Sequence, residues 1–270
     1  MYIPQKYKII NIKKFTPDVK LIRVKSNLNP LPGQFFEVSI LGIGECPLAS
    51  CSYENNYLDI LVRDAGSVTS ALFNLKENDE IFIRGPYGKG FPIKKLKKKN
   101  LITIAGGTGI APITSLIEYV EKNRKDFGNV KIFFGFRNEN YILLKGKIDR
   151  WQKKFDVTIC LDKKEKKNNF QEGFLHQIIS KNKFSVKDTI AFLCGPEIMM
   201  SSVSEVLNNF GLKNNKIYWS MERRMECGMG NCGRCLIQDI YVCKDGPVFR
   251  YDILKPKLEN EASANKTEYL

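Results

Sequence analysis

Four cysteines near the C-terminal end of the chain carry the side chains most able to do chemistry. They are spaced C-x4-C-x2-C-x7-C and are Cys227, Cys232, Cys235 and Cys243. Thiols this close together can form disulfides, hold a zinc ion, act as a redox pair or bind an iron–sulfur cluster. The glycines between them suit a loop that wraps a bound group and points backbone N–H groups at sulfur; they are Gly228, Gly230 and Gly233.

The spacing discriminates among these four possibilities. Zinc sites usually pair two C-x2-C knuckles or mix cysteine with histidine, whereas Cys243 stands alone and the single histidine, His176, is distant. A thioredoxin-like pair would use only Cys232 and Cys235, and a disulfide framework is unusual in an intracellular chain. C-x4-C-x2-C followed by a distant cysteine is the plant-type spacing for a 2Fe–2S cluster. The sequence therefore predicts a 2Fe–2S centre.

Two turns containing glycine indicate a nucleotide site. The apolar run Leu101–Ala105 leads into Gly106-Gly-Thr-Gly109, and Cys194-Gly-Pro196 likewise follows a strand-like run and precedes a helix. Glycines at such a junction let the backbone approach a phosphate, which the helix N-terminus attracts. Either turn alone is explained without a ligand, but in one parallel sheet both lie where ligands bind. The candidate residues are Gly106, Gly107, Thr108, Gly109, Ala111, Pro112, Cys194, Gly195 and Pro196.

A third candidate segment comprises Cys46–Ser50 and Val62–Thr69. From its residues alone it is a strand, a turn and a second strand. Arg63 and the Gly66–Thr69 turn are able to hold a phosphate through a guanidinium and backbone N–H groups. Without support from elsewhere, an exposed arginine beside a hairpin turn is the simpler interpretation.

The elements that must position these residues change character along the chain. In residues 1–93, short β-type runs such as Phe35–Ile40, separated by turn residues, predict a small antiparallel barrel. In residues 94–217, strands that alternate with helices predict a parallel α/β domain. The cysteine module occupies residues 218–254, and the polar tail, residues 255–270, is expected to be poorly ordered.

Composition limits the classes of function. The chain has 270 residues, 43% of them hydrophobic, and a formal net charge of +14. It lacks both a signal pattern and an apolar run of roughly 20 residues, so we expect a cytoplasmic protein without membrane insertion. The basic runs Lys94–Lys99 and Lys163–Lys167 come without a nucleic-acid-binding signature, and we interpret them as solvated loops. We therefore expect no nucleic-acid partner; if the charge has a use, it favours an acidic partner protein.

Together these motifs resemble the ferredoxin–NADP reductase-type flavoproteins that end in a 2Fe–2S module. The resemblance covers about residues 5–254 and is most specific at Met221–Cys235 and Tyr241–Phe249. Within that group the chain is most similar to the corresponding subunit of anaerobic sulfite reductase and the gamma subunit of sulfhydrogenases and related NiFe hydrogenases. It is more distantly similar to the electron-transfer subunit of dihydroorotate dehydrogenase. The resemblance implies FAD in the barrel, NAD(P)H as substrate and a 2Fe–2S cluster on the four cysteines.

The resemblance also implies roles for positions in the barrel. Cys46 to Ala49 match the family's R-P-x-S segment along the flavin ring, and Gly85–Pro92 matches its closing barrel loop. Val62 to Asp64 match the segment past the FAD ribityl and pyrophosphate, and Val68-Thr69 matches its G-T turn. The residues implied to bind FAD are Cys46, Pro47, Leu48, Ala49, Ser50, Val62, Arg63, Asp64, Gly66, Ser67, Val68 and Thr69.

Two positions depart from the family pattern. Cys46 stands where the family has arginine, and Ala49 stands where it has serine. The hydroxyl expected near flavin N5 is therefore missing, and Ser50 or a backbone N–H is left to replace it. The phosphate contact of the lost arginine falls to Arg63 and the glycine turn.

The expected function is an electron-transfer subunit whose partner is a sulfite reductase, hydrogenase or ferredoxin-like iron–sulfur subunit. An alternative is the dihydroorotate dehydrogenase electron-transfer subunit of pyrimidine biosynthesis. A basic nucleic-acid-binding protein with a structural zinc is a third, but it leaves both nucleotide-type turns unexplained. We expect no catalytic acid, base or nucleophile, because the cofactors carry the chemistry. Arg137 is a candidate contact for an NADPH 2′-phosphate, although a solvent-exposed arginine fits equally well.

Overall fold

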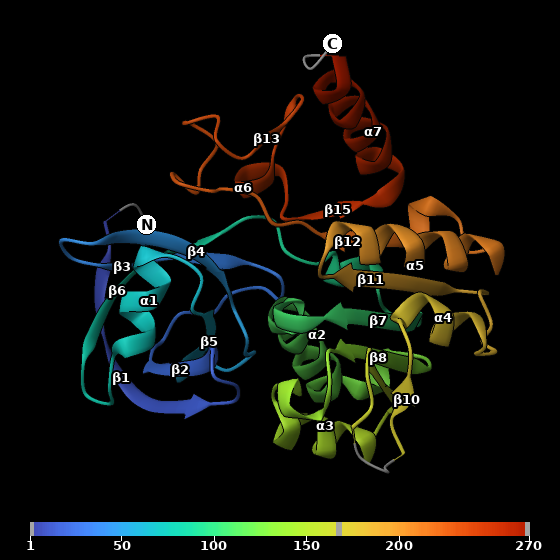
Figure 1. The fold of residues 1–270 in the computed structure, drawn as a ribbon, viewed down its shortest axis with the longest axis horizontal. Coiled ribbons are helices and arrows are strands. Elements are labelled where there is room, and N and C mark those ends of the chain that lie inside the picture. The colour runs from blue at the N-terminus through green and yellow to red at the C-terminus, as the bar shows by residue number, and fades with distance from the viewer. Residues whose placement is uncertain (1–2, 166–168, 268–270) are drawn as a thin grey trace.

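The computed structural model describes residues 3–165 and 169–267. Part of the basic run Lys163–Lys167 and the last residues of the polar tail lie outside the described residues. A six-stranded antiparallel sheet, a seven-stranded mainly parallel sheet and a small cysteine-rich module make up the fold (Figure 1). The fold class predicted from the sequence is confirmed.

The N-terminal sheet has the strand order β4-β3-β6-β1-β2-β5. A bridge between Ser50 and Ile60 joins its two edges, so that the sheet closes into a barrel. Ile9, Ile22 and Phe36 fill the interior and are fully buried. The strands are β1 (Gln5–Lys14), β2 (Val19–Lys25), β3 (Phe35–Ile40), β4 (Gly44–Ala49), β5 (Tyr57–Arg63) and β6 (Glu80–Tyr87).

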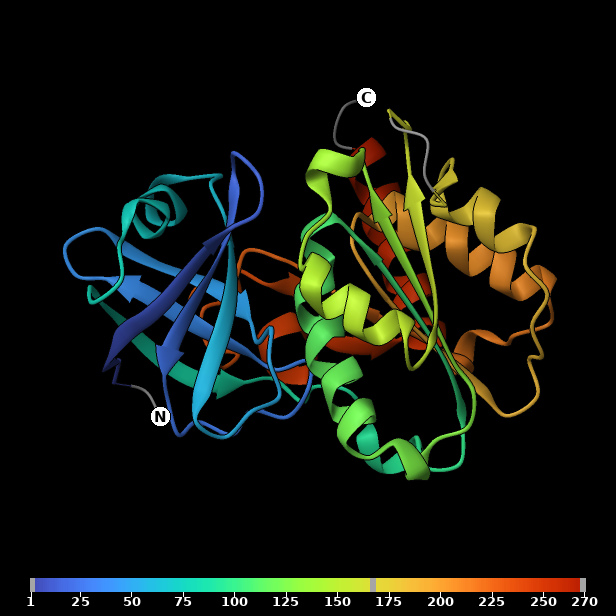
Figure 2. The same ribbon diagram turned by 90° about the horizontal axis from the view of Figure 1, so that it is seen from below.

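The second sheet has the order β10-β9-β8-β7-β11-β12-β15, and only β15 is antiparallel to its neighbour. Its strands are β7 (Asn100–Gly106), β8 (Val130–Phe136), β9 (Asp156–Leu161), β10 (Gln171–Glu172), β11 (Thr189–Cys194), β12 (Ile217–Ser220) and β15 (Val248–Arg250). Its helices are α2 (Ile110–Lys122), α3 (Lys145–Gln152), α4 (Leu175–Ser180) and α5 (Glu197–Asn209). Figure 2 shows α2 and α3 on the face toward the barrel and α4 and α5 on the other face.

The cysteine module is inserted between two strands of the second sheet, β12 and β15. It contains β13 (Leu236–Ile237), β14 (Ile240–Tyr241) and the short helix α6 (Val242–Asp245). Because β12 and β15 pair with each other, both ends of the module are anchored in the nucleotide-type sheet. In Figure 1 the module lies above the barrel and the edge of that sheet.

Two segments differ from the sequence-based expectation. Residues after Gly66 were expected to form a turn and a strand, but helix α1 (Ser67–Asn74) begins there. The hydroxyl of Thr69 accepts hydrogen bonds from the N–H groups of Ala65 and Gly66 at 3.1 and 2.9 Å. This side chain organises the helix start, and Leu72 anchors the helix in the barrel core.

The polar tail was expected to be poorly ordered, and for its described part this is wrong. Helix α7 (Tyr251–Thr267) continues from β15. Tyr251 stacks on Trp219 with ring centroids 4.5 Å apart, and Leu254 is fully buried. Arg223 pairs with Glu261 at 3.3 Å. Tertiary contacts therefore stabilise a helix that its polar sequence does not predict.

Short 3-10 turns connect several elements. They are η1 (Ile93–Lys95), η2 (Gly107–Gly109), η3 (Arg124–Asp126), η4 (Glu139–Tyr141) and η5 (Asn214–Lys216). Within residues 3–165 and 169–267, none of the helices has the length and apolarity that crossing a bilayer requires.

Candidate functional site

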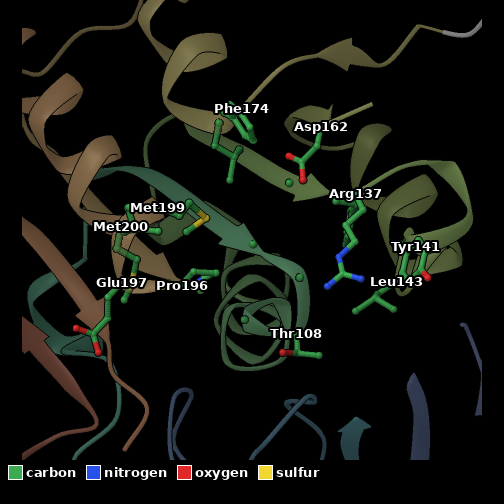
Figure 3. Close-up of a pocket in the computed structure, with 18 of the residues that line it drawn as sticks. Thr108, Arg137, Tyr141, Leu143, Asp162, Phe174, Pro196, Glu197, Met199 and Met200 are labelled. Carbon is green, nitrogen blue, oxygen red and sulfur yellow. The ribbon is translucent and has the colours of Figure 1, made fainter. Parts of the chain in front are cut away.

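The two turns containing glycine lie together at one edge of the parallel sheet. Gly106–Gly109 follows β7 and Gly195-Pro196 follows β11, and these strands are neighbours. Both turns line a cavity of about 810 Å³, seen in Figure 3. Thr16, Asp18 and Arg63 of the barrel line the same cavity, so it opens between the two domains.

Close packing explains why these turns contain glycine. A Cβ on Gly109 would lie 2.5 Å from the carbonyl oxygen of Cys194, and one on Gly106 would lie 2.5 Å from the Met199 sulfur. Gly107 has φ +54 and Gly195 has φ +148, backbone conformations that glycine adopts without strain. The turns therefore touch each other, and the N-terminus of α2 faces the cavity. This is the arrangement that binds a pyrophosphate in α/β sheets.

Arg137 and Asp162 also line the cavity (Figure 3). Arg137 lies 5.4 Å from the centroid of the Tyr141 ring. Burial raises the pKa of the Asp162 carboxyl, and the charge of Arg137 opposes that rise. Arg137 lines the cavity but is also exposed, so both interpretations of it from the sequence stay open. Sequence reasoning missed Asp162, although its position directly after an apolar strand was a usable signal.

Phe174 was also missed. It lines the same cavity, is 54% exposed and stacks on His176 with ring centroids 6.0 Å apart. An exposed aromatic ring at the edge of a cavity provides a flat surface for a planar ligand group. His176, interpreted from sequence as remote from the cysteines, lies at the nucleotide-type cavity instead.

Arg63 and the start of α1 lie on the barrel side of the cavity. The Arg63 guanidinium pairs with Asp18 at 3.3 Å and remains half-exposed. Asp64 accepts a hydrogen bond from the Ser70 hydroxyl, so it helps to hold the first turn of α1. The first N–H groups of a helix lack intrahelical partners, which makes this terminus able to bind a phosphate.

The β4 segment does not offer the hydroxyl that its expected role needed. The Ser50 hydroxyl donates to the Ser52 carbonyl at 2.8 Å, and the Ser50 N–H donates to the Gln34 carbonyl at 3.1 Å. Ser50 therefore already uses both of its donors inside the barrel. Burial, reinforced by Glu37 and Glu45, raises the pKa of the Cys46 thiol to about 12, so Cys46 stays neutral. The remaining positions of this segment, Pro47 to Ala49, are half-buried.

The four cysteines lie in one compact loop region. Cys235 and Cys243 are buried, Cys227 is half-buried and Cys232 is exposed. Gly230 N–H donates to the Cys243 sulfur at 3.1 Å, and Asn231 N–H donates to the Cys227 sulfur at 3.3 Å. Three glycines have φ between +76 and +81, and these are Gly228, Gly230 and Gly233. The loop thus aims backbone N–H groups at sulfur, as the donor set of an iron–sulfur cluster requires.

The thiols of this loop differ in acidity. Burial raises the pKa of Cys227, but the N–H groups of Met229 and Asn231 outweigh it and bring the value to about 6. Burial and the neighbouring Cys235 raise the pKa of Cys243 to about 12. In the described part of the chain, no group of three or more Cys, His, Asp or Glu side chains converges on one metal ion. A cluster with two irons takes two ligands at each and does not require such convergence.

Comparison with known families identifies the second and third parts of the chain. Residues 103–205 match the oxidoreductase NAD-binding domain, and residues 222–255 match the iron-sulfur cluster binding domain of dihydroorotate dehydrogenase B. Together with the barrel, these matches define an NAD-binding oxidoreductase of the ferredoxin–NADP reductase type.

Individual relatives narrow this class. Sulfhydrogenase 2 subunit gamma of Pyrococcus furiosus is 34% identical, over 90% of this chain and 93% of its own. A probable dihydroorotate dehydrogenase B electron transfer subunit of Methanocaldococcus jannaschii is also 34% identical, over 97% of both chains. A chain of an NADH-dependent reduced ferredoxin-NADP oxidoreductase has the same fold, with a TM-score of 0.76 at 22% identity over 100% of this chain and 98% of that chain.

The chain therefore belongs to the family of FAD- and NAD-binding electron-transfer subunits that end in an iron–sulfur domain. The two curated relatives are equally identical to it, so identity alone does not choose between the two kinds of complex.

Proposed function

We propose that this chain passes electrons between NAD(P)H, FAD and a 2Fe–2S cluster, to or from a partner subunit of a hydrogenase or an anaerobic sulfite reductase. The contact between the cysteine loop and the barrel supports this proposal most directly. A Cβ on Gly228 would lie 2.7 Å from the Tyr87 ring, so the loop backbone rests on the barrel. The module also continues the nucleotide-type sheet through β15. The module that carries the candidate cluster site thus contacts both the barrel and the nucleotide-type sheet.

The assignment of residues follows the cavity and the loop. NAD(P)H is assigned to the α/β turns, Gly106 to Gly109 with Ala111, Pro112 and Cys194 to Pro196. FAD is assigned to the barrel residues of the Cys46–Ser50 segment and of Val62–Thr69. The cluster is assigned to the thiols of Cys227, Cys232, Cys235 and Cys243.

When bound, FAD would supply two-electron chemistry toward NAD(P)H and one-electron chemistry toward a cluster held by the four cysteines. The residues of the chain position and separate these groups. The N-termini of α1 and α2 provide backbone N–H groups for phosphates, and Arg63 adds a guanidinium. Cys46, which is neutral, contributes no charge beside the flavin segment. The buried Cys235 and Cys243 shield one side of the cluster site from water.

The partner is proposed to meet the loop at Cys232. This is the one exposed member among the four cysteines, and Arg224 and Arg234, which flank the loop, are also exposed. The electron-transfer subunit of dihydroorotate dehydrogenase is the second candidate, supported by the relative that matches over 97% of both chains. Purification of the native complex separates the two candidates, because only the second would bring a dihydroorotate-binding flavoprotein.

The test is purification of the chain under anaerobic conditions, followed by a visible spectrum and by flavin, iron and sulfide analysis. FAD with two irons and two sulfides per chain is the expected content. A colourless protein that contains zinc would contradict the proposal.

A further inference from the structure

Arg84, on β6 of the barrel, is a buried arginine with every N–H group engaged. An arginine side chain has five N–H donors. Its Nε donates to Glu45 at 2.9 Å, and one Nη2 N–H donates to the other oxygen of the same carboxylate. Its Nη1 donates to the Tyr87 hydroxyl at 3.1 Å. Glu45 and Tyr87 therefore fix the orientation of the guanidinium from within the barrel.

The two remaining N–H groups of Arg84 reach the cysteine module. Nη1 donates to the carbonyl of Cys227 at 2.7 Å, and Nη2 donates to the carbonyl of Glu226 at 2.7 Å. Both are short, charge-assisted hydrogen bonds to consecutive backbone carbonyls. The carbonyl bonded by Nη1 belongs to Cys227, which is assigned to the cluster. A barrel side chain thus holds the backbone of the cluster loop directly.

The choice of partners shows that these bonds are specific. Glu37 of β3 is directly opposite Arg84 in the sheet register and is fully buried. Within the described structure neither carboxylate oxygen of Glu37 has a hydrogen-bond partner. Arg84 therefore bonds the loop carbonyls while leaving an adjacent buried carboxyl unbonded.

Further contacts make the same surface close-packed. Lys89 N–H donates to the Gly246 carbonyl at 2.6 Å, and a Cβ on Gly88 would lie 2.6 Å from Pro247. Phe35 and Tyr87 of the barrel share one buried cluster with Met225, Cys235 and other residues of the module. These contacts hold the module on the barrel, and Arg84 adds a hydrogen bond to the carbonyl of Cys227, a cysteine assigned to the cluster.

We propose that Arg84 is a positioning residue that sets the distance between the flavin-binding barrel and the cluster loop, and so the rate of electron transfer between them. This inference rests on the proposed function. The rate of electron transfer falls as the distance between donor and acceptor grows, so a loop that moves away from the barrel slows the transfer. A lysine cannot replace the arginine, because a single ammonium does not span a carboxylate and two carbonyls.

The test compares Arg84→Lys with wild-type holoprotein in rapid-mixing experiments. We expect NADH to bleach the flavin absorbance at an unchanged rate, and the cluster signal to develop several-fold more slowly than in the wild type. Hydrogen exchange provides a second readout, in which amides of residues 226–231 exchange faster in the variant. Arg23→Lys is the matched control, because Arg23 makes a bidentate barrel pair with Asp59 without any bond to the module.

The outcomes are distinguishable from failure of the proposed function. Wild-type protein without FAD or without a cluster would overturn the proposed function itself. A wild-type rate of cluster reduction in Arg84→Lys, with both cofactors bound, would overturn the role of Arg84. If Arg84→Lys loses the cluster, Glu45→Gln serves as the second variant, because Glu45 orients the same guanidinium. A Glu45→Gln protein that keeps the cluster and reduces it more slowly would support the role of Arg84. One that loses the cluster or reduces it at the wild-type rate would overturn that role. Equal slowing in Arg23→Lys would show a general effect on the barrel and would likewise contradict the proposal.

Discussion

Lys147 of α3 lies 3.4 Å from the carboxylate of Asp59 on β5, so an ammonium of the α/β domain pairs with a fully buried carboxylate of the barrel. Lys147 also pairs with Glu118 of α2 at 2.9 Å and donates to the Cys51 carbonyl at 3.1 Å. The helices that carry Lys147 and Glu118, α3 and α2, lie on the face of the sheet toward the barrel (Figure 2). The two domains are thus joined by charge as well as by apolar packing.

Replacement of Lys147 by methionine is expected to destabilise the protein. Breaking a buried ion pair leaves a carboxylate without compensation and costs about 3 kcal/mol. The loss of stability should not exceed this value by much, because Arg23 still pairs with Asp59. The measurement is the urea midpoint of unfolding. Lys154→Met is the control: Lys154 is half-exposed and pairs with Glu121, so its loss is expected to cost less than about 1 kcal/mol. Equal midpoints for the two variants would contradict the prediction.

Substitution of Gly109 by alanine is expected to impair nucleotide binding. The added Cβ would lie 2.5 Å from the Cys194 carbonyl oxygen and force the two turns apart. Such overpacking costs about 1–3 kcal/mol, so the KM for NAD(P)H should rise roughly tenfold or more. Gly146→Ala is the control, because a Cβ there meets no atom within 4 Å in the described structure. An unchanged KM for NAD(P)H in Gly109→Ala would contradict the assignment of this turn to the nucleotide site.

Glu37 should make stability depend on pH. Burial raises the pKa of its carboxyl from 4.5 to about 8, and Arg84 opposes the rise while Glu45, Cys227 and Glu226 add to it. Below pH 4.5 both states are protonated. Between that pH and about 8 only the unfolded state loses the proton, so stability falls with rising pH by about 1.4 kcal/mol per unit.

Glu37→Gln tests this dependence. The variant removes the ionisable group, so its stability should exceed that of the wild type near pH 8 and approach it near pH 4.5. The measurement is the urea midpoint across this pH range. A wild type and a variant whose midpoints run parallel over the whole range would show that Glu37 ionises freely in the folded protein.

The sequence was informative where a local pattern determines the backbone. The Gly106–Gly109 turn was recognisable because an apolar strand precedes it and a helical pattern follows it. The spacing of the four cysteines was sufficient to predict that they bind a 2Fe–2S cluster together. Helix α1 was missed because Val68, Thr69 and Phe73 favour strands, and its start depends on one threonine side chain.

Other features depend on contacts between distant parts of the chain. Helix α7 contains Pro256 and a polar sequence, and its order comes from Trp219 and Arg223 of another segment. The role of Arg84 has the same origin, because its partners at Glu226 and Cys227 belong to the module rather than to the barrel. No local pattern around Arg84 specifies those partners.

The central claim is that electrons leave this chain through the cysteine loop, and Cys232→Ser tests it most directly. Cys232 is exposed, so the substitution should leave the fold intact. The measurement is the rate of flavin bleaching by NAD(P)H beside the rate at which electrons reach the co-purified partner, with Asn231→Ser as the control in the same loop. We predict unchanged flavin bleaching and blocked delivery to the partner. A Cys232→Ser variant that reduces its partner at the wild-type rate would contradict this pathway.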